Sequence, residues 1–229
     1  MNRGEMIDRV QHTLGLEEAL VNDETALVAD WLNEGVDDIV QRTRPSTRVI
    51  SLTLTGGVKI HDMASTIVSL LDLEVGGYFL ERYSREDITY RQQMGQTGYA
   101  YEEPLLWVSP VYDEDKSFRA YGVFRPTPMS DDLHDPSQPQ YGGLAPGFHP
   151  VIVTYALWKG GEYVQHEQSA GGEKWRIQYE GQDGTQGDIA RIKRILNKRV
   201  SPGAALRRDP TRNLGALSDA DAFLAGGGR

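Results

Sequence analysis

The chain has 229 residues, no cysteine and a formal net charge of −9. This length predicts one or two domains with a buried core. The lack of cysteine excludes disulfides, thiolate metal sites and a cysteine nucleophile. The chain contains no run of about 18 apolar residues, and its acid-rich first 30 residues are unlike a secretory signal, so neither a membrane span nor a leader is expected.

Charge is distributed unevenly along the chain. Residues 1–45 hold 10 acidic and 4 basic side chains, whereas the eight bases within 191–212 are accompanied by Asp209 as the sole acid. A basic patch at one end of an acidic chain suits contact with an acidic partner. The same bases could instead be a solvated face that complements a helix dipole, and the sequence leaves both interpretations open.

Two amphipathic helices are predicted at the N-terminal end. The first covers residues 3–15 and ends at Gly15. The second is capped by Asn22 and runs to about Arg42, with Pro45 closing it. Helical spacing of apolar residues places a core stripe on this second helix. The stripe includes Leu27, Trp31, Leu32 and Ile39.

The following hundred residues are typical of β-structure. Arg48–Leu54 alternates and is followed by Gly56-Gly57 and Val58–Ile60, which predicts a hairpin. Further strands are expected at Ile67–Val75, Leu105–Ser109 and Phe118–Phe124, with a brief helix at residues 84–93 capped by Ser84. Together they predict a small antiparallel sheet or barrel. Residues 126–146 contain five prolines and little that could form a core, so we expect a long ordered or semi-ordered loop. Loops of this length are usually functional or disordered.

Helical periodicity returns at Gly147. One helix is expected there, with Phe148, Ile152 and Tyr155 on its buried face. A second is predicted from about Gln168 to Arg199, with Trp175 and Ile192 in its stripe. Three glycines interrupt this second helix and predict either a kink or the close approach of another backbone. The glycines are Gly181, Gly184 and Gly187.

Residues 200–229 form a tail with two prolines and spaced apolar residues. A short helix that folds onto a partner fits this pattern, and a terminus without fixed structure is the alternative. The expected fold is therefore α+β. Residues 1–45 and 146–199 form one helical bundle, residues 46–145 form a β-rich insertion with the proline-rich loop, and residues 200–229 dock onto a partner.

The sequence holds no recognisable catalytic frame. Phosphate-binding glycine motifs, the G-x-S-x-G elbow and the H-E-x-x-H zinc frame are all missing. Glu102 and Glu103 are adjacent, so on a strand they point to opposite faces and are poorly placed to act as a hydrolase pair. An acidic loop could ligate a divalent ion, although a solvated loop is the favoured interpretation. This loop carries Asp131, Asp132, His134 and Asp135. We expect no enzyme activity, no metal and no cofactor.

Two helical stretches carry a resemblance to a known family. Residues 26–43 (ALVADWLNEGVDDIVQRT) contain a Trp-x-Asn-Glu pattern, and residues 147–184 begin with a Gly-Phe-His-Pro sequence that leads into a second, aromatic-rich helix. The order of these elements resembles that of the head-to-tail adaptor (connector) proteins of tailed bacteriophages. The residues that carry the resemblance are Trp31, Asn33, Glu34, Phe148, His149, Pro150, Trp175 and Tyr179.

The resemblance implies a structural protein of the virion neck that is assembled in the host cytoplasm. Such adaptors form a ring, typically of twelve subunits, beneath the portal protein, and they surround the channel for DNA packaging and ejection. A further neck or tail component binds below, and DNA passes without sequence-specific contact. The role of the β-rich insertion is open, since it could contact that component or clamp a neighbouring subunit.

Subunit and portal contacts are expected in the C-terminal part of the chain, and by resemblance the tail meets the portal. The residues expected in these contacts are Arg191, Arg194, Lys198, Arg199, Arg207, Arg208, Leu214, Leu217, Phe223 and Leu224. A nucleic-acid-binding module that uses the basic run 191–212 is the alternative function.

Overall fold

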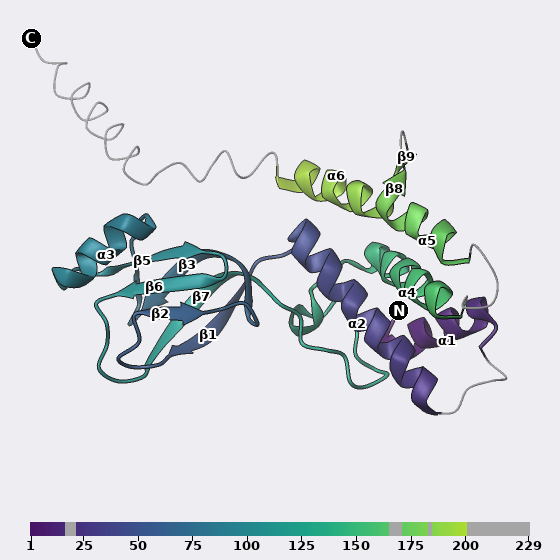
Figure 1. Ribbon diagram of the computed structural model, residues 1–229, viewed down its shortest axis with the longest axis horizontal. Coiled ribbons are helices and arrows are strands. Elements are labelled where there is room, and N and C mark those ends of the chain that lie inside the picture. The colour runs from purple at the N-terminus through teal and green to yellow at the C-terminus, as the bar shows by residue number, and fades with distance from the viewer. Residues whose placement is uncertain (17–21, 165–170, 183–184, 201–229) are drawn as a thin grey trace, which may run out of the picture. The chain divides into compact units, whose positions relative to one another are not determined.

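A computed structural model describes residues 1–16, 22–164, 171–182 and 185–200, with backbone only for 22–24, 164 and 198–200 (Figure 1). The tail predicted at 200–229 lies almost wholly outside the described residues. The chain divides after Ala190 into two compact units. The described residues contain both helices and antiparallel sheets, so the chain is an α+β protein as expected.

The α-helices are α1 (Arg3–Leu14), α2 (Asn22–Thr43), α3 (Arg85–Gln93), α4 (His149–Val164), α5 (Gly171–Glu180) and α6 (Asp188–Val200), and the 3-10 turns are η1 (Pro139–Tyr141) and η2 (Pro146–Phe148). The strands are β1 (Arg48–Leu54), β2 (Ile60–Asp62), β3 (Ile67–Val75), β4 (Tyr78–Phe79), β5 (Gly98–Glu102), β6 (Leu105–Ser109), β7 (Lys116–Phe124), β8 (Gly181–Gln182) and β9 (Thr185–Gln186). No helix among these residues is long and apolar enough to cross a membrane.

The N-terminal helices begin and end for local reasons. Asn2 caps α1 in a reciprocal capping box with Glu5, and Gly15 ends the helix in the left-handed conformation at φ 68°. Helix α2 begins at Asn22 and ends before Arg44, which takes φ 49° immediately ahead of Pro45. The predicted end of the first helix at Gly15 is confirmed.

Helices from the two ends of the first unit pack on one another. Helix α2 packs on α4, α1 contacts both, and α4 packs along α5. Glycines permit two of these contacts. A Cβ at Gly35 would lie 3.0 Å from the Tyr155 ring, and one at Gly161 would lie 2.8 Å from the Gly172 backbone. Trp31, Leu32, Ile39, Phe148, Ile152, Tyr155 and Ile192 are buried, whereas Leu27 and Trp175 are half-buried.

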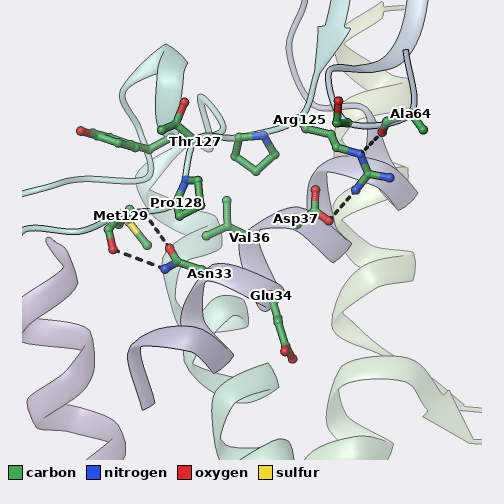
Figure 2. Close-up of a pocket in the computed structure, with 12 residues that line it drawn as sticks. Asn33, Glu34, Val36, Asp37, Ala64, Arg125, Thr127, Pro128 and Met129 are labelled. Atoms are coloured by element: carbon green, nitrogen blue, oxygen red, sulfur yellow. Dashed lines mark hydrogen bonds and ion pairs between the residues drawn. The ribbon is translucent and has the colours of Figure 1, made fainter. Parts of the chain in front are cut away.

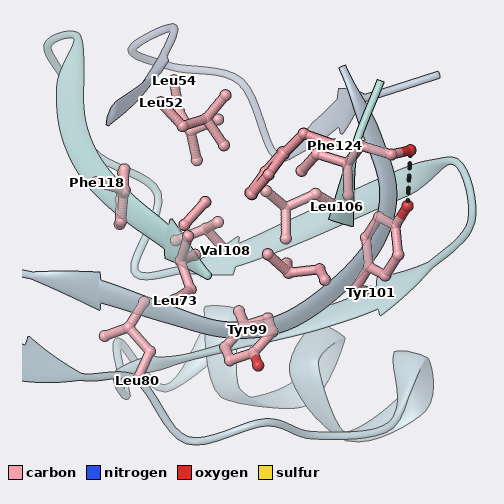
Figure 3. Packing of buried hydrophobic residues seen from close by; sticks show 13 residues of the cluster. Leu52, Leu54, Leu73, Leu80, Tyr99, Tyr101, Leu106, Val108, Phe118 and Phe124 are labelled. Atoms are coloured by element: carbon pink, nitrogen blue, oxygen red, sulfur yellow. Dashed lines mark hydrogen bonds between the residues drawn. The ribbon is translucent and has the colours of Figure 1, made fainter. Parts of the chain in front are cut away.

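The β-rich part has two small antiparallel sheets with a shared core. One sheet has the strand order β1-β7-β3-β4, and the other has the order β2-β6-β5. Apolar side chains from both sheets meet between them, among them Leu73, Phe118 and Phe124 from one and Tyr99 and Leu106 from the other (Figure 3). Alternating strand residues therefore bury one face of each sheet.

Helix α3 covers the opposite face of the three-stranded sheet. Ile88 of α3 packs on Ala100 of β5 and Trp107 of β6 in a second, smaller core. The helix begins where predicted, because Ser84 accepts a hydrogen bond from the Asp87 amide. The β-rich part is thus layered as sheet, sheet and helix.

The predicted hairpin of Arg48–Leu54 with Val58–Ile60 is wrong. Strand β1 pairs with β7, and β2 pairs with β6 in the other sheet. The turn at Gly56 is set by long-range contacts instead, since the Gly56 amide donates to Asp115 and the Gly57 amide to the Tyr112 carbonyl. The glycine pair predicted the turn correctly, but it did not identify the strand that pairs with β1.

The single helix predicted over 168–199 is also wrong. Helix α5 stops at Glu180, and the short β8–β9 pair separates it from α6. Gly181 takes φ 94°, and a Cβ at Gly187 would meet the Gly181 nitrogen at 2.3 Å. The glycines allow a tight chain reversal, which explains why they interrupt the helical pattern.

The proline-rich segment 126–146 forms the long loop that was predicted, with the short turns η1 and η2, but it contributes more to the core than expected. Met129 and Leu144 are buried within it. The segment is also tied to α1, because the amides of Arg3 and Gly4 donate to the carbonyls of His134 and Asp132. It therefore holds the start of the chain against the helices.

Candidate assembly interface

A groove of about 640 Å³ runs beside α2. Its opposite wall is the segment that leaves β7, and the β2–β3 turn closes one end (Figure 2). Most of the lining is apolar. The lining residues are Asn33, Glu34, Val36 and Asp37 of α2, Ala64 and Ser65 of the turn, Arg125, Pro126, Thr127, Pro128 and Met129 after β7, and Tyr141 of η1.

Asn33 fixes one wall of the groove to the other. Its amide nitrogen donates to the Met129 carbonyl at 3.3 Å, and its amide oxygen accepts from the Met129 amide at 2.8 Å. This paired bond reproduces the pattern of a backbone ladder with a side chain (Figure 2). It gives a physical role to the Asn of the Trp-x-Asn-Glu pattern.

Arg125 closes the end of the groove nearest the β-sheets. Its guanidinium donates to Asp37 Oδ2 at 2.8 Å and to the Ala64 carbonyl at 2.6 Å. Arg48 in turn donates to the Arg125 carbonyl at 2.9 Å. The second carboxylate oxygen of Asp37 is buried and has no hydrogen-bond partner among the described residues. Arg125 thus joins α2 to the β-rich part, while one oxygen of the Asp37 carboxylate has no described hydrogen bond.

The face of α2 that borders the groove is acidic. Asp30, Glu34 and Asp37 follow one another at spacings of four and three residues and therefore share a face. Asp30 and Glu34 are exposed. Carboxylates four residues apart on a helix repel each other and disfavour the isolated helix. Glu34 consequently places an exposed carboxylate on the lining of the groove, one turn from Asp30 and beside the Asp37–Arg125 ion pair.

The exposed face of α6 is basic and includes one apolar side chain. Arg191 and Arg194 are exposed. Ile195, which lies one turn after Arg191 on the same face, is 42% exposed. The other side of the helix is buried at Ile189 and Ile192.

The predicted interface residues are thus only partly described. Arg191 and Arg194 lie on α6, and of Lys198 and Arg199 only the backbone is described. The remaining six lie outside the described residues: Arg207, Arg208, Leu214, Leu217, Phe223 and Leu224. Among the described side chains, Arg191 and Arg194 therefore form a basic face on α6.

The acidic loop is engaged in structural contacts. Asp132 pairs with Arg3, and His134 stacks on Tyr141 and bonds its hydroxyl at 2.9 Å. No cluster of three potential metal ligands occurs among the residues that the structure describes. Glu103 lies on the surface and pairs with Arg44 at 3.9 Å, whereas Glu102 ends β5.

His149, from the Gly-Phe-His-Pro sequence, is buried to 1% exposure at the start of α4. Its Nε2 lies 3.3 Å from the Leu144 carbonyl and 3.7 Å from Asp135. Burial lowers the pKa of His149 below its ordinary value, partly opposed by the Leu144 hydrogen bond. The histidine thus anchors the end of the proline-rich segment to α4.

Sequence reasoning missed the groove because its walls come from distant segments. Arg125 and Asp37 are 88 residues apart, and no local pattern links them. The available signal was the run of prolines after β7, since Pro126 and Pro128 stiffen this wall. A long ordered or semi-ordered loop was expected here, but its role as a groove wall was not.

Comparison with known proteins addresses the resemblance directly. A family model described as SU10 adaptor protein matches residues 1–208. Among curated proteins no match was found. The matched range covers both helical stretches, the β-rich part and α6, so the resemblance drawn from residues 26–43 and 147–184 is confirmed. This chain belongs to the SU10 adaptor protein family and is a structural head–tail adaptor of a tailed phage.

Proposed function

We propose that the protein forms a ring beneath the portal of the capsid, extends the DNA channel and provides the attachment site for the tail. The family match over residues 1–208 carries this proposal. By the same resemblance the ring has twelve subunits, belongs to the virion neck and assembles in the host cytoplasm. Its helices from residues 1–45 and 146–199 form the helical bundle expected of such a subunit.

The charge pattern supports a ring. An acidic α2 face and a basic α6 face are unlike surfaces, and contacts between unlike surfaces repeat head to tail until a rotation closes them. A net charge of −9 also suits a channel wall, because a negatively charged wall repels the phosphate backbone instead of gripping it. DNA can then slide during packaging and ejection.

The portal contact is assigned to the tail. Residues 200–229 contain Leu214, Leu217, Phe223 and Leu224 as spaced apolar anchors, together with Arg207 and Arg208. Segments of this type fold upon a partner and gain affinity from a few anchors. The next neck or tail component binds the opposite side of the ring.

Mass photometry of the protein mixed with its portal tests the proposal. Wild type should add multiple copies to each portal particle. A variant that ends at Val200 should keep its helical circular dichroism but fail to bind the portal. Portal particles that gain no mass from wild type would contradict the ring, and unaltered binding by the shortened chain would contradict the assignment of the tail.

A nucleic-acid-binding module is a second candidate, favoured by the exposed Arg191, Lys193 and Arg194 of α6. It predicts affinity for duplex DNA that falls steeply with salt, in proportion to the phosphates neutralised. Titration of labelled duplex at rising salt separates the two functions, since the adaptor function predicts no such binding at low salt.

A further inference from the structure

We propose that the groove beside α2 receives the exposed face of α6 from a second copy of this chain. The inference deepens the proposed ring, on which it rests, by naming the two surfaces that meet between neighbouring subunits. It assigns the groove to an occupant of defined chemistry, an apolar side chain framed by basic ones.

The groove lacks an occupant among the described residues. Its volume of about 640 Å³ opens between Pro126 and Pro128 on one side and Val36 on the other. Apolar surface left in water costs free energy in proportion to its area. A branched aliphatic side chain would fill part of this space, and Ile195 presents one at 42% exposure.

The charges of the two surfaces are opposite in sign. On α2 the carboxylates of Asp30 and Glu34 are exposed and lie one turn apart, and on α6 the guanidinium of Arg194 is exposed beside Ile195. A helix α6 that inserts Ile195 into the groove therefore presents a basic side chain to an acidic border.

Charge also selects the occupant. The chain has a net charge of −9, so most of its own surface would be repelled by the border of the groove. Helix α6 departs from that average, because Arg191 and Arg194 share the face of its exposed isoleucine and no acid lies between them. An acidic groove and a basic helix on one chain form a head-to-tail pair when two copies meet.

Cysteine cross-linking tests the contact, since the chain has no cysteine of its own. One variant carries Glu34→Cys, and a second variant with a larger tag carries Ile195→Cys. The two proteins are mixed with portal and oxidised. Disulfide formation between the two sizes of chain is expected. Lys193→Cys is the matched control for α6, since Lys193 lies about 160° around the helix from Ile195. Asp8→Cys, an exposed acid on α1, is the control for α2.

Charge exchange tests the same contact without a covalent bond. Glu34→Lys and Arg194→Glu should each weaken the association of subunits by roughly ten-fold or more, because like charges then face each other. A mixture of the two variants should recover association. The changed groove of one variant then meets the changed α6 of the other with opposite charge, and the two unchanged surfaces also meet. Asp8→Lys and Lys193→Glu change charge equally and should leave association unchanged.

The outcomes separate this contact from the ring itself. Cross-linked pairs of unlike size, together with recovery in the mixture, support the inference. Portal-bound rings without the 34–195 disulfide would overturn the contact and leave the proposed function standing. Absence of any multi-copy particle with portal would contradict the proposed function instead.

Discussion

The helical part and the β-rich part of the first unit obtain their cores in different ways. The two sheets are built from one continuous stretch, from β1 to β7, and share a core among their own residues. The helices combine α1 and α2 with α4 and α5, which lie more than a hundred residues further along the chain. The β-rich part thus obtains its core from one continuous stretch, whereas the helical part depends on the meeting of distant segments.

Arg125 connects the two parts. It leaves the last strand of the insertion and pairs with Asp37 of α2. The groove lies at this junction, so its shape depends on both parts (Figure 2). The contrast teaches that each part builds its own core, whereas the groove requires residues from both.

A cavity in the β-core gives the sharpest test of that independence. Phe118→Ala removes a ring that is 1% exposed and should lower the free energy of unfolding of the β-rich part by about 3–5 kcal/mol. Hydrogen exchange should accelerate in β1, β3 and β7 while α2 and α4 remain protected. Equal loss of protection in both helices would show that the two parts unfold as one.

A hydrogen-bond deletion tests the helical part. Tyr179 is buried, and its hydroxyl donates to Asp38 Oδ2 at 2.6 Å. Tyr179→Phe should lower the free energy of unfolding of the helices by about 1.5–3 kcal/mol, because the bond is to a charged acceptor. Urea denaturation followed by helical circular dichroism measures it. The exposed Tyr163→Phe is the matched control and should change stability little.

Acid should weaken the helical part through His149. Its pKa is lowered by burial, so the unfolded chain takes up a proton below about pH 6.5 while the folded chain still excludes it. Stability should therefore fall as pH decreases from 6.5 toward the lowered pKa, by at most about 1.4 kcal/mol per pH unit. Thermal unfolding from pH 7.5 to 5 measures this, and His149→Gln should flatten the profile. An unchanged slope in that variant would remove His149 as the cause.

Sequence reasoning succeeded where structure is set locally. Gly15 and Ser84 cap helices through hydrogen bonds within a few residues, so their positions were predictable from residue type. It failed where the partner is remote. The pairing of β1 with β7 and the glycine-directed reversal at Gly181 depend on tertiary contacts that local spacing does not encode.

The candidate site shows the same division. The basic face at Arg191 and Arg194 was predictable from helical spacing. The groove that we propose as its partner was not, since Asn33 meets Met129 across 96 residues. The Trp-x-Asn-Glu pattern indicated that Asn33 matters through family resemblance, and the structure supplies the reason.

The most direct test of the central claim is electron microscopy of the full-length protein bound to its portal. The account predicts a closed ring coaxial with the portal, with the basic α6 of each subunit against the α2 groove of the next. Isolated copies scattered on the portal, or a portal without added density, would contradict it.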